Sequence, residues 1–77
     1  MIIKQGTNVI IVTRCAAAYQ DIDLDTPLEL DMRTIDRVVG ADPALGIGRS
    51  IIFLNDGTTI NVMEPISDFI GFDFQLN

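Results

Sequence analysis

The chain has 77 residues, of which 48% are hydrophobic, and a net charge of −6. This apolar content excludes a disordered chain, and the acidity disfavours non-specific nucleic-acid binding, which depends on cations that displace counterions from phosphates. The chain has no histidine and a single cysteine, so an internal disulfide is excluded and both the commonest metal ligand and the commonest general base are missing.

These numbers predict one small domain that spans residues 1–77. Domains of this size are marginally stable and usually gain stability from a disulfide, a metal or oligomerisation. By elimination we expect a homo-oligomer, with no cofactor and no catalytic activity. No apolar run approaches the roughly 20 residues of a membrane span. A single cysteine suits a reducing compartment, which predicts a cytoplasmic protein that does not contact membranes.

The N-terminal third is predicted to contain strands. Residues 2–5 form either a short strand or a loose terminus, and a turn follows. Val9–Arg14 is β-branched and apolar on both faces, which is typical of a strand. Residues 15–18 are interpreted as a continuation of that strand with small side chains, in which Cys15 is a small buried hydrophobe.

Residues 21–32 alternate between acidic and apolar side chains, which is the period of a strand. Because Pro27 interrupts the pattern, we expect an edge strand bent at this residue, or two short strands. The apolar positions are Ile22, Leu24, Leu28, Leu30 and Met32, and the acidic ones are Asp21, Asp23, Asp25, Glu29 and Asp31.

The spacing of Asp21, Asp23 and Asp25 resembles the opening of a calcium-binding loop. Such a loop also needs glycine at its sixth position and glutamate at its twelfth, where this chain has Thr26 and Met32. The three aspartates are therefore interpreted as a solvated strand face, with a weak cation site as the alternative. No metal site is predicted.

Residues 31–40 fit either a short helix capped by Asp31 or a turn at residues 32–34 followed by a strand. The strand is preferred because the segment is short and contains Val38-Val39. In the following loop, Gly46-Ile47-Gly48-Arg49 is interpreted as a plain flexible loop, and an anion cradle is the alternative.

The strongest signal is a β-hairpin at residues 50–63, whose two apolar runs flank Asn55-Asp56-Gly57. A two-residue loop pairs Phe53 with Ile60, whereas a three-residue loop pairs Ile52 with Ile60. A shift of one residue exchanges the partner faces, so the register stays open. The first strand is apolar on both faces in either register. It is therefore a central strand, or one whose second face meets another layer or another subunit.

The C-terminal segment is predicted to form a short helix and a last strand. Pro65 starts the helix, and the spacing of Ile66, Phe69 and Ile70 predicts one apolar face. Residues 72–76 alternate again and could pair with a neighbouring molecule. The predicted interface residues are Ile52, Leu54, Phe72, Phe74 and Leu76.

The fold class expected from these elements is mainly β, with some α+β character. We expect five or six short strands in a twisted sheet or small barrel, and one short helix near residues 65–70.

The pattern Ile35-x-x-Val38, the hairpin around Asp56-Gly57 and Ile60-x-Val62-x-Glu64 resembles FlbD-type small flagellar regulatory proteins. It is also similar to the β modules of LytTR-type DNA-binding domains. The resemblance covers about residues 30–70 and implies a regulatory role, without carrying over any functional residue.

The function expected from the sequence is that of a small homo-oligomeric binding or regulatory module, whose partner is a second copy or another protein. The alternative is a nucleic-acid-associated transcriptional regulator; an orphan protein of a phage or mobile element is a further possibility. The cations available for the alternative are Lys4, Arg14, Arg33, Arg37 and Arg49.

Overall fold

The computed structural model describes residues 2–6, 8–18, 26–72 and 75–76, and it confirms the expected β-rich class. Seven strands, where five or six were expected, belong to one mixed sheet, and the helical segments are short 3-10 turns. The strands are β1 (Ile3–Gln5), β2 (Val9–Arg14), β3 (Thr26–Asp31), β4 (Ile35–Gly40), β5 (Ser50–Leu54), β6 (Thr59–Val62) and β7 (Gln75–Leu76). The 3-10 turns are η1 (Ala16–Ala18), η2 (Met32–Thr34), η3 (Pro43–Leu45) and η4 (Ile66–Phe69).

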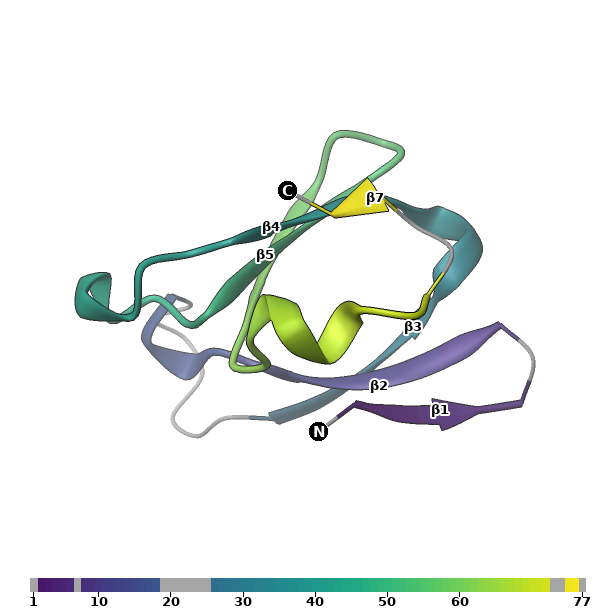
Figure 1. Cartoon of the computed structure of the whole chain (residues 1–77), viewed down its shortest axis with the longest axis horizontal. Coiled ribbons are helices and arrows are strands. Elements are labelled where there is room, and N and C mark those ends of the chain that lie inside the picture. The colour runs from purple at the N-terminus through teal and green to yellow at the C-terminus, as the bar shows by residue number, and fades with distance from the viewer. Residues whose placement is uncertain (1, 7, 19–25, 73–74, 77) are drawn as a thin grey trace.

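The sheet consists of two halves that curl toward each other (Figure 1). In one half, β2 pairs antiparallel with β1 and β3. In the other half, β5 lies between β4 and β6, and β7 pairs parallel with β4. Over the described residues the sheet does not close into a barrel, so the twisted-sheet alternative is the one that the chain adopts.

The two halves meet at one short seam, which is the only strand pairing between them in the described part of the chain. There Arg14 of β2 lies opposite Val62 of β6. The N–H of Cys15 donates to the Asn61 carbonyl at 2.9 Å, and the N–H of Met63 donates to the Thr13 carbonyl at 2.8 Å.

The side chain of Glu64 extends this seam by one hydrogen-bonding position. Its carboxylate accepts the Thr13 N–H, at 2.8 Å to Oε1 and 3.0 Å to Oε2. The backbone carbonyl of Glu64 accepts the Ser50 hydroxyl at 2.7 Å, and both residues are buried. One residue therefore joins β2 to β5 at the point where the chain leaves β6.

The hairpin has the three-residue loop, because Ile52 pairs with Ile60 and the Leu54 N–H donates to the Thr58 carbonyl at 2.8 Å. Gly57 adopts a φ of 90°, a conformation that this type of loop requires and that costs glycine little. Since Ile60 faces the core, this register turns Ile52 toward the core as well.

Residues 31–40 form the turn η2 and the strand β4, as the preferred interpretation predicted. A β-bulge at Asp36 shifts the register, so Ile35 lies opposite Leu54 while Arg37 lies opposite Phe53. The bulge directs Ile35 and Val38 to the same buried face. Their helix-like spacing of three residues is therefore produced by an irregular strand.

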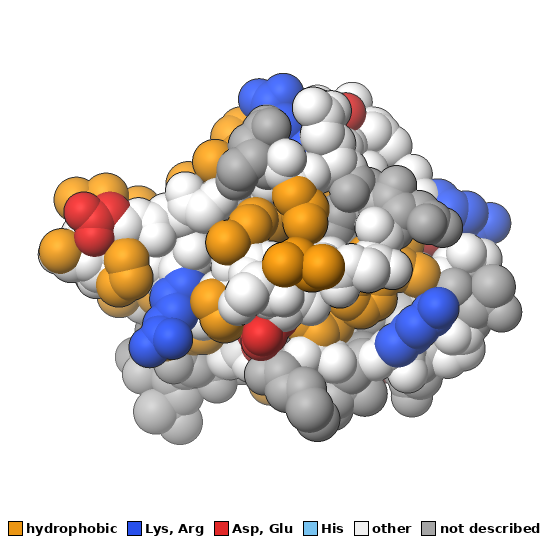
Figure 2. Space-filling model, in the orientation of Figure 1, with side chains coloured by type: hydrophobic (Ala, Val, Ile, Leu, Met, Phe, Trp, Pro, Cys, Tyr) orange, Lys and Arg blue, Asp and Glu red, His pale blue; other side chains and the backbone are white. Residues whose placement is uncertain are grey.

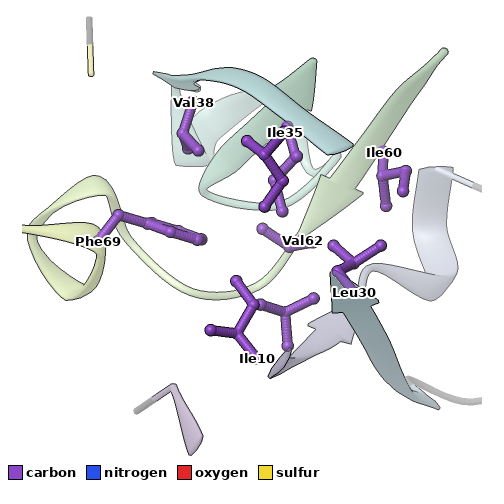
Figure 3. Close-up of a cluster of buried hydrophobic side chains, with 9 residues drawn as sticks. Ile10, Leu30, Ile35, Val38, Ile60, Val62 and Phe69 are labelled. Carbon is purple, nitrogen blue, oxygen red and sulfur yellow. The ribbon is translucent and has the colours of Figure 1, made fainter. Parts of the chain in front are cut away.

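The core is built from the inner faces of β2 to β6 and from η4 (Figure 3). Phe69, which is fully buried, points from η4 toward the strand residues. The buried cluster consists of Ile10, Val12, Leu30, Ile35, Val38, Ile52, Ile60, Val62 and Phe69. In β3, Leu28 and Leu30 pack toward this core and Glu29 is exposed, which confirms the predicted alternation within the described part of that segment.

Two local predictions need correction. Residues 15–18 do not continue the strand: the Ala18 N–H donates to the Cys15 carbonyl at 3.2 Å and the chain turns into η1, in line with the helical preference of alanine. Pro65 is the N-cap of η4 and not its first helical residue. The last strand is described only as Gln75–Leu76, because residues 73 and 74 lie outside the described residues.

Gly48 is required by a close approach of two backbones. Its φ is 101°, and a Cβ atom there would lie 2.5 Å from the Val62 carbonyl oxygen. Gly46 also has a positive φ, 72°, but nothing lies within 4 Å of its Cβ position. We therefore expect Gly48→Ala to lower the free energy of unfolding by about 3 kcal/mol, through strain and overpacking together. Gly46→Ala should cost about 1 kcal/mol.

Urea denaturation of the two variants measures this difference directly. Equal losses would contradict the close approach, because conformational strain alone acts at both positions.

The Glu64 contact generates a second prediction. Glu64→Ala leaves the Thr13 N–H without its acceptor and should lower the free energy of unfolding by about 1–3 kcal/mol. Glu64→Gln keeps an oxygen acceptor and should lose less. Glu29→Ala, at an exposed position of β3, is the matched control and should change stability by less than about 0.5 kcal/mol. Hydrogen exchange at the Thr13 amide should accelerate in Glu64→Ala, and unchanged exchange there would refute the assignment.

Candidate functional site

The described residues of the predicted interface pack against the core of their own chain. Ile52 is fully buried in the core of its own chain, so its side chain does not reach a second copy. Leu54, Phe72 and Leu76 are partly buried and pack against the same core. Phe74 lies outside the described residues.

The residues on the outer face of β5 are Ile51 and Phe53, and not the predicted Ile52 and Leu54. Ile51 and Phe53 point away from the core and are half-buried. The guanidinium of Arg37 lies over the Phe53 ring, with its Cζ atom 4.4 Å from the ring centroid, and covers part of it. The sequence left the hairpin register open, and the observed register turns Ile52 toward the core and Ile51 and Phe53 away from it.

Among the described residues, the large apolar side chain with the highest exposed fraction is that of Ile70, which is 71% exposed at the C-cap of η4. In a 3-10 helix, residues three apart share a face, so Ile66 and Phe69 turn inward together and Ile70 is rotated away from them. The α-helical spacing assumed from the sequence placed all three on one face. The true period would have identified Ile70 as a surface residue.

Apolar side chains gather on the surface over the position of η4 (Figure 2). Met63 is 37% exposed, and Ile66 and Phe72 are half-buried. We call Ile66, Ile70 and Phe72 the η4 surface; Met63 lines a hollow with Cys15 and Arg49 and is not part of it. None of the three residues belongs to a catalytic motif, and their shared chemistry is that of a contact area.

In the described part of the chain, the side chains considered for catalysis or metal binding do not come together in one site. Cys15 is a free, buried thiol, as predicted. The three aspartates Asp21, Asp23 and Asp25 lie outside the described residues. Elsewhere, the described acidic and cysteine side chains form no cluster of three that could hold a metal ion.

The cations are distributed over several elements. Lys4 lies on β1, Arg14 on β2 and Arg49 in the loop before β5, and the basic atoms in Figure 2 occupy separate places. Arg33 pairs with Asp31, and Arg37 stacks on Phe53. Their placement therefore adds no support to the alternative role of a nucleic-acid regulator.

Asp31 and Arg33 form an exposed ion pair at η2. The Asp31 carboxylate accepts the backbone N–H of Arg33 at 2.9 Å and its Nη2 at 2.6 Å. The side-chain hydrogen bonds from Arg33, followed by its backbone N–H, lower the pKa of Asp31 to about 2. The pKa of Asp56 is also lowered, by hydrogen bonds from Thr58 in the hairpin loop.

Comparison with known protein families, curated proteins and solved structures found no match. The likeness to FlbD-type proteins and LytTR modules therefore stays a prediction. In the residues that the structure describes, no helix has the length and apolar character needed to cross a bilayer.

The Asp31 pair predicts an acid-dependent loss of stability. Because its pKa is depressed in the folded state, the pair contributes fully above the unfolded pKa near 3.8, and the contribution disappears as the pH falls toward 2. The difference in unfolding free energy between the wild type and Asp31→Asn should therefore be constant above about pH 5 and shrink between pH 4 and 2. Urea denaturation across this range measures it.

The Arg33→Gln background is the control, because it removes the main cause of the pKa shift. There the same Asp31→Asn comparison should lose much of its pH dependence. An unchanged profile would show that Arg33 is not the cause.

Proposed function

We propose that this protein is a non-catalytic binding module that acts by associating with a second copy of itself through the η4 surface. The observation that carries the proposal is the 71% exposure of Ile70 directly after η4, next to the half-buried Ile66 and Phe72. A contiguous exposed apolar patch on a soluble domain commonly marks a contact with another molecule.

Charge favours a second copy as the occupant. Two chains of net charge −6 repel each other wherever their acidic surfaces meet. The side chains that define the η4 surface are apolar and the acid of η4, Asp68, is half-buried, so two copies can bring Ile70 face to face around a two-fold axis. A symmetric contact requires a patch that is complementary to itself, and an apolar patch meets this condition.

Size supports the same interpretation. A stable interface buries about 800 Å² on each partner, which is roughly one sixth of the 4810 Å² surface of this chain. The η4 surface would form the apolar centre of such a contact, and the polar residues around it the rim. Association would also supply the stability that a 77-residue chain with one cysteine and no histidine cannot obtain from disulfides or histidine-ligated metals.

Ile70→Asp tests the proposal because the residue is exposed and its replacement leaves the core intact. Sedimentation equilibrium should show a dimer of the wild type at micromolar concentration. The variant should raise the dissociation constant at least tenfold, since both copies lose a buried isoleucine and gain a buried charge.

Leu45→Asp is the matched control. Leu45 is 66% exposed on η3, away from η4, and its replacement should leave the dissociation constant unchanged. A wild-type protein that stays monomeric at about 1 mM would overturn the proposal, as would equal weakening by the two variants.

A further inference from the structure

A second surface feature lies at the seam between the two halves of the sheet. A hollow of about 340 Å³ opens there between the end of β2 and the loop that precedes β5. Its lining includes Cys15 and Ala17 from one side, Gly48 and Arg49 from the other, and Met63 from the end of β6. The volume lies within the range of sites that hold small molecules.

The walls of this hollow are held in place by hydrogen bonds. The Arg49 N–H donates to the Val62 carbonyl at 2.9 Å, and the Asn61 side-chain amide donates to the Ile47 carbonyl at 3.0 Å. Gly48 packs so closely against β6 that no side chain fits there. A ligand therefore meets a preformed surface and does not have to order a loop.

The chemistry of the lining is apolar with one cation. Ala17 and Met63 present apolar atoms, and methionine adapts its shape to a bound group. Arg49 is exposed, and within the described residues its guanidinium forms no ion pair or hydrogen bond. Arg33 and Arg37, in contrast, are engaged with Asp31 and with Phe53.

The two acids nearest to Arg49 in the sequence, Asp42 and Asp56, each lie seven residues away, and each accepts a hydrogen bond within its own turn. Asp42 precedes η3, and its carboxylate accepts the Ala44 N–H at 2.9 Å within its own turn. The guanidinium is therefore available to an anion at the edge of an apolar hollow.

We propose that this hollow binds a small organic monocarboxylate. Arg49 would pair with the carboxylate through two parallel hydrogen bonds, a geometry that suits the planar guanidinium. The apolar body would contact Ala17 and Met63. The net charge of −6 opposes ligands that carry several negative charges, which favours a monocarboxylate over a phosphate ester.

Benzoate is a suitable probe, with benzamide as its uncharged counterpart. Titration followed by amide NMR should shift the Gly46 and Gly48 signals with a dissociation constant of roughly 1 mM, as expected for nine non-hydrogen atoms. Benzamide should bind at least fivefold more weakly. Equal binding of the two probes, or no shift at about 20 mM benzoate, would overturn the proposal.

Two variants locate the site. Arg49→Gln should weaken benzoate binding at least fivefold, and Ala17→Leu should do the same by filling the hollow while leaving Arg49 in place. Arg33→Gln is the matched control, because Arg33 is also an exposed arginine but lies outside this hollow, and it should bind like the wild type. Unchanged binding by both Arg49→Gln and Ala17→Leu would refute the assignment.

Discussion

The hydrogen bonds between the Glu64 carboxylate and the Thr13 N–H extend the short seam at which the two halves of the sheet pair. Backbone pairing between β2 and β6 ends here because the chain turns away at Pro65, which has no N–H to offer. A side-chain carboxylate replaces the missing carbonyl, and its charge strengthens the bond. The Glu64 carbonyl holds the buried Ser50 hydroxyl at the same point. The core between the halves, the entry into η4 and the hollow beside Cys15 all depend on this seam.

The two surfaces proposed for binding are consequences of this arrangement. The chain leaves the seam through Pro65 and crosses the inner side of the sheet as η4, which fills the core with Phe69 and leaves Ile70 outside. On the other side of the seam, Gly48 packs directly against the Val62 carbonyl and leaves an apolar hollow beside Arg49. The first surface is apolar and suits a second copy. The second carries one available cation and suits a small anion.

The hairpin shows how one local feature decides which residues are available for contact. Both faces of β5 are apolar, so composition does not distinguish its inner from its outer side. The three-residue loop turns Ile52 inward and Phe53 outward, where Arg37 covers the ring. A loop shorter by one residue would have exposed Ile52 and buried Phe53. The residues that β5 could present at an interface therefore depend on the register of the hairpin.

The sequence by itself determined the β-rich class, the hairpin, the strand at residues 35–40 and the buried thiol, because periodicity and turn chemistry are local properties. It did not determine the hairpin register, the 3-10 period of η4 or the role of Glu64. The alternation of Ile60, Val62 and Glu64 indicates that the acid faces inward, but its donor, Thr13, is 51 residues away along the chain. The bulge at Asp36 and the tight packing of Gly48 likewise depend on partner strands. Only the tertiary structure brings such distant groups together, and it alone decides which apolar residues remain exposed.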